Sequence, residues 1–269
     1  MWARGRPVVM GIVNVTPDSF ADGGRFFAPA DAIVHALALL DEGADTLDIG
    51  GESTRPGAEP VAAAAELDRV IPVVAGILAA RPESLVSIDT SKAVVAEAAL
   101  AAGARIVNDV TAGRDPAMLP LVARAGATVV LMHMRGEPRS MQSTTDYDDV
   151  VAEVHHFLRE RAAVAGRAGV PASAIVLDPG IGFGKDLAGN LRLLAALPDL
   201  AALGFPVLLG ASRKSFISTL TGADVAARLP GSLAAAHSAL ACPRAIVRVH
   251  DVAATVQYLA VAAALAAVE

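Results

Sequence analysis

Residues 102–133, AGARIVNDVTAGRDPAMLPLVARAGATVVLMH, contain one full copy of the pattern that predicts the fold. Gly103 and Gly126 each follow a helical run and precede a short apolar run, as expected when a helix ends on a left-handed glycine before a strand. The two apolar runs, 105–107 and 128–132, are continuous rather than alternating, and polar residues follow both of them. Continuous runs are typical of strands buried on both faces of a parallel sheet.

The same alternation continues in both directions along the chain. Strands are expected at Val8–Val13, Thr46–Ile49, Leu85–Ile88, Arg105–Val107, Thr128–Met132, Ala174–Leu177, Val207–Leu209 and Ala245–Val249. Helices are expected to begin near Pro29, Val61, Lys92, Asp115, Tyr147, Leu187, Arg213 and Val252. Eight such units, spaced by roughly 34 residues, favour an α/β fold of the (β/α)8 TIM-barrel type over an open doubly wound sheet.

The connection between the seventh and eighth strands is longer than the others. We expect it to hold two helices with a break near Pro230–Gly231. No linker or low-complexity segment divides the chain, so we interpret residues 1–269 as a single domain.

Composition excludes several classes of protein. Hydrophobic residues make up 54% of the chain and the net charge is −6 without a basic block, which argues against disorder and against nucleic-acid binding. The apolar runs are too short to span a membrane, and the N-terminal residues lack the apolar core of a signal peptide. The lone Cys242 is expected to be a buried, inert thiol. We therefore expect a cytoplasmic protein.

Polar residues follow every one of the eight apolar runs. A polar residue after one strand is usually a helix cap, but in barrels the C-terminal strand ends build the active site. Polar residues at all eight ends, mixing carboxylates, amides and cations, therefore predict a site there. They are Asn14, Asp48 with Glu52, Asp89, Asn108–Asp109, His133, Asp178, Ser212–Lys214 and Arg248–Asp251.

Six motifs at these ends resemble a known family. They are GIVNVTPDSF at 11–20, GGESTRPG at 50–57, LMHM at 131–134, DPGIGFGK at 178–185, SRKS at 212–215 and RVHD at 248–251. In this order, and over the chain from about Pro7 onward, they resemble the dihydropteroate synthases, pterin-binding barrels that sulfonamides inhibit. The resemblance implies condensation of 6-hydroxymethyl-7,8-dihydropterin diphosphate with p-aminobenzoate, with release of pyrophosphate, in folate biosynthesis.

A buried pterin needs both donors and acceptors from its pocket. Asp89, Asn108, Asp178 and Lys214 offer that mixture. The resemblance assigns to Asp178 the 2-amino group and N3 of the pterin. It further implies substrate contacts from Met132, Phe183, Gly210, Arg213 and Ser215.

The diphosphate needs cations, which Arg248 and His250 would supply after the eighth strand. The resemblance implies that Asn14 is a ligand of a magnesium ion that is also bound by the pyrophosphate. One amide oxygen is a sufficient protein ligand, because Mg²⁺ keeps several waters. The groups expected to act on the reaction itself are Asp89, Lys214, Arg248 and His250. Positioning and charge stabilisation would suffice without covalent catalysis.

Two loops rich in glycine and proline, Val15–Arg25 and Glu52–Gly57, are typical of lids. In the family they complete the p-aminobenzoate pocket. The resemblance thus assigns Ser53, Thr54, Arg55 and Pro56 to that pocket, with Arg55 and Asp18 as loop-stabilising charges.

Each residue also has a purely structural interpretation. Asp89, Asn108 and Asp178 could be helix caps, Phe183 and Met132 could be core residues, and His133 and His250 could be structural imidazoles. A corrinoid-dependent methyltransferase on the same barrel would share only the pterin half of the site, and a silent paralogue would bind pterin without condensing it. The resemblance further implies that the protein forms a homodimer. It also implies that its binding partners are its small-molecule substrates, the pterin diphosphate and p-aminobenzoate.

Overall fold

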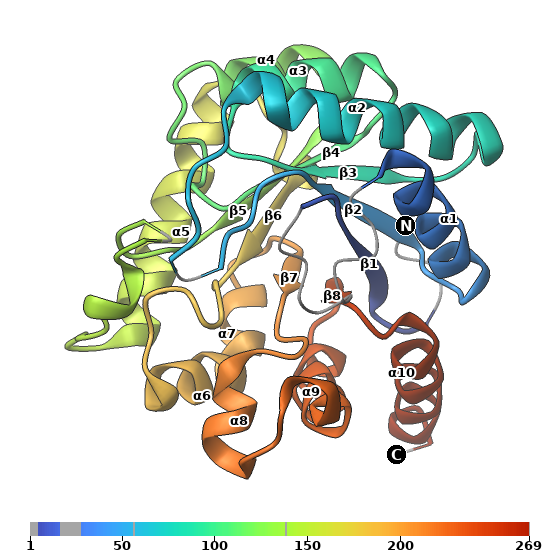
Figure 1. The fold of residues 1–269 in the computed structure, drawn as a ribbon. Coiled ribbons are helices and arrows are strands. Elements are labelled where there is room, and N and C mark those ends of the chain that lie inside the picture. The colour runs from blue at the N-terminus through green and yellow to red at the C-terminus, as the bar shows by residue number, and fades with distance from the viewer. Residues whose placement is uncertain (1–4, 17–27, 56, 138, 269) are drawn as a thin grey trace.

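The computed structural model describes residues 5–16, 28–55, 57–137 and 139–268. Eight parallel strands in this part of the chain form a closed barrel in sequence order, from β1 through β8 and back to β1 (Figure 1). Their bounds are β1 Val8–Asn14, β2 Thr46–Gly50, β3 Val86–Asp89, β4 Ile106–Asp109, β5 Thr128–Met132, β6 Ile175–Asp178, β7 Val207–Leu209 and β8 Ala245–Val249. The predicted TIM barrel is confirmed, and each strand differs from its predicted range by at most two residues at either end.

The helices lie around the outside of this barrel (Figure 1). Their bounds are α1 Pro29–Asp41, α2 Ala63–Ala80, α3 Ala93–Ala101, α4 Met118–Ala125, α5 Val150–Arg167, α6 Leu187–Ala195, α7 Leu197–Ala201, α8 Ser215–Thr221, α9 Leu229–His237 and α10 Val252–Ala266. The predicted left-handed glycines are confirmed, because Gly103 and Gly126 both have positive φ.

Two helices do connect β7 and β8, but the break precedes the predicted position. Helix α8 ends at Gly222, which has a φ of +73°, and α9 begins at Leu229. Pro230 therefore lies in the first turn of α9, where its missing N–H removes no helical hydrogen bond. The short helix α7 was not predicted.

Two layers of side chains fill the barrel and explain where the site lies. The lower layer is apolar and consists of Val8, Met10, Ile106, Val130, Val176, Leu208 and Ile246. Since strand side chains alternate between faces, the residue two positions after a lower-layer residue also points inward. Those positions include Asn108, Met132, Asp178, Gly210 and Arg248. The sequence thus fills the bottom of the barrel with hydrocarbon and its C-terminal mouth with polar groups.

The outer core lies between the strands and the helices, and it includes the buried Cys242. Burial raises the pKa of the Cys242 thiol to about 11, in keeping with an unreactive cysteine. Within the described ranges, no helix is both long enough and apolar enough to cross a membrane.

Candidate active site

A buried charge network forms the floor of the barrel mouth. The Arg248 guanidinium bridges two carboxylates, with its Nε 2.6 Å from Asp48 Oδ2 and its Nη2 2.8 Å from Asp89 Oδ2. Asn108 Nδ2 donates to the same Asp48 oxygen at 2.8 Å. These side-chain contacts join strands β2, β3, β4 and β8 near their C-terminal ends.

Burial dominates the electrostatics of this floor. It raises the pKa of Asp89 to about 7, although the positive charge of Arg248 opposes the shift. Burial also disfavours the charged form of Arg248, but Asp48 and Asp89 outweigh this effect and raise its pKa. Arg248 therefore stays cationic, and two of its nitrogens contact the carboxylates of Asp48 and Asp89.

Asp178 and Lys214 face the opposite side of the mouth. One oxygen of Asp178, Oδ1, accepts a 2.7 Å hydrogen bond from the Gly180 backbone, while Oδ2 accepts none from any described residue. Lys214 Nζ donates to the Ile181 carbonyl and lies 4.4 Å from the centre of the Phe183 ring. Burial raises the pKa of Asp178 and lowers that of Lys214 to about 8, each opposed by the charge of the other. A vacant carboxylate oxygen beside a buried ammonium is suited to a polar heterocycle.

Lys185 organises the glycine-rich loop that follows β6. Its Nζ donates to the carbonyls of Gly180 at 2.9 Å, Phe183 at 2.8 Å and His133 at 3.2 Å, and lies 3.0 Å from His133 Nδ1. Burial lowers the pKa of His133 to about 3, so its imidazole is neutral and can accept this hydrogen bond. Gly180 has a φ of +66°, and a Cβ there would lie 1.9 Å from the His133 carbonyl oxygen. Only glycine fits at this turn.

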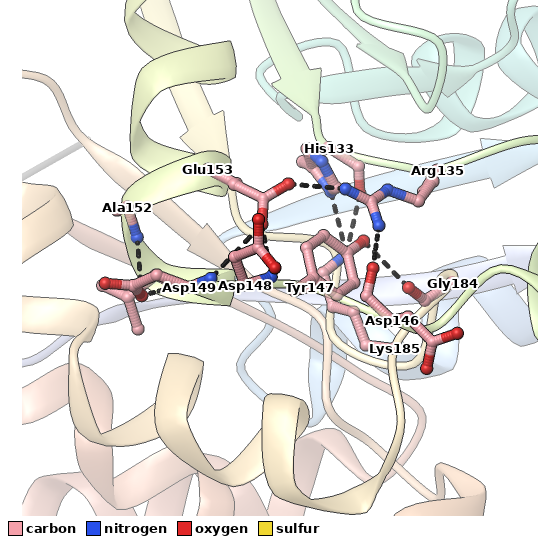
Figure 2. A network of polar contacts seen from close by, with 11 residues as sticks. His133, Arg135, Asp146, Tyr147, Asp148, Asp149, Ala152, Glu153, Gly184 and Lys185 are labelled. Atoms are coloured by element: carbon pink, nitrogen blue, oxygen red, sulfur yellow. Dashed lines mark hydrogen bonds and ion pairs between the residues drawn. The ribbon is translucent and has the colours of Figure 1, made fainter.

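A second group of contacts supports the loop from outside, as Figure 2 shows. The Tyr147 hydroxyl donates to the Gly184 carbonyl at 2.9 Å, and the Arg135 guanidinium lies 3.8 Å from the centre of the Tyr147 ring. Arg135 is held in turn by Glu153 and by the Asp146 carbonyl. The loop that carries Phe183 is therefore fixed on both sides.

The ends of β7 and β8 are joined by His250 and Arg213. Ser212 Oγ accepts from the His250 backbone N–H at 3.2 Å and lies 3.0 Å from His250 Nδ1. Burial, assisted by Arg248 and Arg213, lowers the pKa of His250 to about 3. The His250 ring is therefore neutral. Because the Ser212 hydroxyl can donate to Nδ1, the proton is assigned to Nε2, which makes His250 a hydrogen-bond donor.

Arg213 has a left-handed backbone, with a φ of +57°, and its side chain pairs with Asp251. This ion pair fixes the turn that presents Lys214.

Comparison with known proteins agrees with this geometry. The family model described as "Pterin binding enzyme" matches residues 10–250. The chain belongs to the pterin-binding enzyme family. It is 47% identical to the dihydropteroate synthase of Escherichia coli (strain K12), over an alignment covering 95% of this chain and 90% of that relative.

Solved structures of relatives have the same fold. A Yersinia pestis dihydropteroate synthase in complex with a sulfonamide drug matches with a TM-score of 0.93 and 44% identity, covering 97% of this chain and 95% of that one. A Xanthomonas albilineans dihydropteroate synthase with 4-aminobenzoic acid matches with a TM-score of 0.90 and 52% identity, covering 98% and 94%. The resemblance seen in the six motifs is thus confirmed, and the chain is a folate-pathway transferase of the dihydropteroate synthase type.

A cavity of about 100 Å³ lies at the C-terminal ends of β2, β3 and β4, and Asp89 is among the residues that line it. Ser53 and Thr54 line it from one side, and Thr90, Ser91, Val110, Thr111 and Met134 complete it with Glu52 and Asp89. Arg55 lies close enough to His250 to help lower the pKa of that imidazole. Pro56 and Asp18, which were expected here, lie outside the described residues.

The Mg²⁺ prediction rests on Asn14. This residue ends β1 at the mouth, and its partly exposed side chain makes no hydrogen bond to another described residue. No group of three or more histidine, cysteine or acidic side chains that could hold a metal occurs among the described residues. Asn14 thus leaves one amide oxygen at the mouth, which is compatible with Mg²⁺ because that ion takes few protein oxygens.

Several residues of the site were not predicted. Asp48 was noted at a strand end but given no role, and the sequence offered no sign that it would hold both Asn108 and Arg248. Lys185 lay within a quoted motif but was given no role of its own. The remaining predicted residues, Gly210 and Ser215, lie after β7, with Gly210 at an inward-facing position and Ser215 beginning α8.

Proposed function

We propose that the mouth of the barrel condenses 6-hydroxymethyl-7,8-dihydropterin diphosphate with p-aminobenzoate in a magnesium-dependent reaction. The observation that carries the proposal is the vacant Oδ2 of buried Asp178 beside Lys214, facing the Arg248 floor. This set offers a carboxylate acceptor, an ammonium donor and an amide within one buried site, which is what the edge of a reduced pterin requires. Pterin recognition is thus assigned to Asp178, Asn108 and Lys214, with Phe183 and Met132 as apolar walls.

In the assigned orientation, Asp178 Oδ2 accepts from the 2-amino group and N3 of the pterin, and Lys214 donates to the ring. The Nε2–H of His250 donates to a diphosphate oxygen, while Arg248 contributes positive charge from beneath. Bound magnesium, with Asn14 as its protein ligand, would neutralise charge on the diphosphate. Asp89, which is paired with Arg248, completes the polar floor.

The reaction breaks the bond between the pterin methylene carbon and the diphosphate oxygen, which keeps the electron pair. The aniline nitrogen then forms the new C–N bond and gives up one proton to pyrophosphate or water. No described side chain needs to act as nucleophile, since the amine of p-aminobenzoate is neutral and reactive. Catalysis rests on holding the two reactants in line and stabilising the departing charge.

The test uses purified protein with the pterin diphosphate, Mg²⁺ and labelled p-aminobenzoate. Equal amounts of dihydropteroate and pyrophosphate would support the proposal. Tight pterin binding without any product would instead identify a silent paralogue, and removal of Mg²⁺ with a chelator should abolish product formation.

We further propose that the chain acts as a single-domain cytoplasmic homodimer. The support for the dimer is a groove of about 680 Å³ between α9 and α10, lined by apolar residues such as Leu233, Val261 and Leu265. Val261 and Leu265 are 57% and 68% exposed, which is costly for large side chains unless another surface covers them. Sedimentation of the protein should give twice the mass of the chain, and Val261→Glu should halve it.

A further inference from the structure

Three charged side chains meet behind the p-aminobenzoate pocket. Glu66, in the first turn of α2, is fully buried, and Lys92 Nζ lies 2.5 Å from its Oε2. The same Nζ also contacts Glu52 Oε2, at the end of β2. Lys92 immediately precedes α3, so this cluster joins two consecutive βα units, β2–α2 and β3–α3. Both carboxylates raise the pKa of Lys92, more than offsetting the opposing effect of its burial.

Glu52 connects this cluster to the loop between β2 and α2, which contributes Ser53 and Thr54 to the cavity. Its second oxygen, Oε1, accepts a 3.0 Å hydrogen bond from the Val61 backbone, so one carboxylate joins the start of the loop to its end. Arg69 adds a 2.7 Å hydrogen bond to the Gly51 carbonyl at the base of the same loop. Ser53 and Thr54, which line the cavity, lie directly after Glu52.

Lys92 supports the wall of the cavity without contacting a molecule bound inside it. Lys92 does not line the cavity, whereas its sequence neighbours Thr90 and Ser91 do, and so does its ion-pair partner Glu52. The cluster therefore connects both walls of the cavity, β2 with its loop on one side and the end of β3 on the other.

We propose that Lys92 is a positioning residue for the second substrate. Through Glu52 it sets the geometry of the Ser53–Thr54 wall, and thereby the affinity for p-aminobenzoate and for sulfonamides, while leaving the pterin half of the site alone. The inference rests on the proposed function, because it assigns this cavity to the aryl amine. A purely structural Lys92 would stabilise the barrel and leave the Michaelis constants unchanged.

The test uses the double variant Lys92→Met/Glu66→Gln, which removes the bridge without leaving an unpaired buried carboxylate. We expect the KM for p-aminobenzoate to rise about tenfold or more, while the KM for the pterin diphosphate stays within twofold. Lys92→Arg, which keeps the charge, should restore most of the affinity. As a matched control, Arg81→Met/Asp41→Asn removes an exposed ion pair of 2.8 Å at the other end of α2 and should change neither constant.

A second variant guards against misfolding of the first. Glu52→Gln alters a side chain that is already 21% exposed and turns an amide toward Lys92, so it should fold and should weaken p-aminobenzoate in the same way. Unchanged KM for p-aminobenzoate in folded Glu52→Gln, or equal rises in both constants in the double variant, would overturn the proposal.

Direct titration of a sulfonamide in the presence of Mg²⁺ and pyrophosphate gives a readout that needs no turnover. If the unmodified enzyme makes no dihydropteroate, the proposed function fails. The positioning role is then still decided by whether sulfonamide affinity falls about tenfold in the variants. Equal sulfonamide affinity, or none in any form of the protein, overturns it.

Discussion

Replacing Gly180 with alanine tests how far the site depends on the loop after β6. Gly180 has a φ of +66°, and a Cβ would approach the His133 backbone oxygen to 1.9 Å. Relief requires separation to at least the 3.4 Å of ordinary contact, and neither partner is the end of a flexible side chain. The loop must therefore move, and it carries the donor to Asp178 Oδ1 and two of the carbonyls that hold Lys185 and Lys214.

The effect of Gly180→Ala has two components, a backbone cost that any left-handed glycine would share and a loss of activity caused by the clash with His133. A non-glycine residue in the left-handed region costs about 1–2 kcal/mol wherever it occurs. Gly126, at the end of α4, has a φ of +61° and open space around its Cβ position, so Gly126→Ala isolates this backbone cost. A misplacement of about 1 Å in an active site can cost about 100-fold in rate. We therefore expect Gly180→Ala to lose about 100-fold or more in kcat/KM, and Gly126→Ala less than twofold.

The assay measures dihydropteroate formation together with the free energy of unfolding in urea. Gly126→Ala should lose about 1–2 kcal/mol of stability and keep its activity. The reasoning is refuted if Gly180→Ala, still folded, loses no more activity than Gly126→Ala.

Three further predictions concern charged groups. Asp178→Asn should weaken pterin binding by about 2–4 kcal/mol, because its amide replaces an acceptor with a donor, and calorimetry with the free pterin alcohol measures this. Arg248→Met should destabilise the fold by about 3 kcal/mol in urea unfolding, since it leaves Asp48 and Asp89 unpaired, and additional substitution of Asp89 by Asn should recover part of that loss. Burial lowers the pKa of Lys185 to about 7. Between pH 7 and about 10.4 the unfolded chain therefore binds more protons at Lys185 than the folded protein does. The contribution of Lys185 to the free energy of unfolding accordingly rises with pH over that range. The stability of the unmodified protein relative to Lys185→Met should therefore increase from pH 7 to pH 9.5, and a constant difference would contradict the lowered pKa.

Much of the barrel could be predicted because its signals are local. The apolar runs at 128–132 and 245–249 match β5 and β8 fully, since continuous apolar segments flanked by polar ones leave little freedom in where a buried strand ends. The helix break before β8 was misplaced because proline in the first turn of a helix resembles proline at a break.

The polar strand ends could be recognised as a site, but their pairing could not. Arg248 lies 200 residues from Asp48 and 159 from Asp89, and no local pattern indicates which carboxylates a guanidinium will join across a barrel. The neutral state of His250 likewise depends on burial and on Arg248, which only the closed fold brings together. Lys185 was overlooked for the same reason, because its carbonyl partners come from a turn whose shape depends on positive φ angles.

The most direct test of the central claim is equilibrium binding and turnover measured on one preparation. With the pterin diphosphate, Mg²⁺ and labelled p-aminobenzoate, the unmodified protein should release one pyrophosphate for each dihydropteroate formed. Folded Asp178→Asn should form far less product at the same pterin concentration, because it binds the pterin more weakly. Full turnover by folded Asp178→Asn, or pyrophosphate release without dihydropteroate from the unmodified protein, would contradict the assignment of the barrel mouth as the site of condensation.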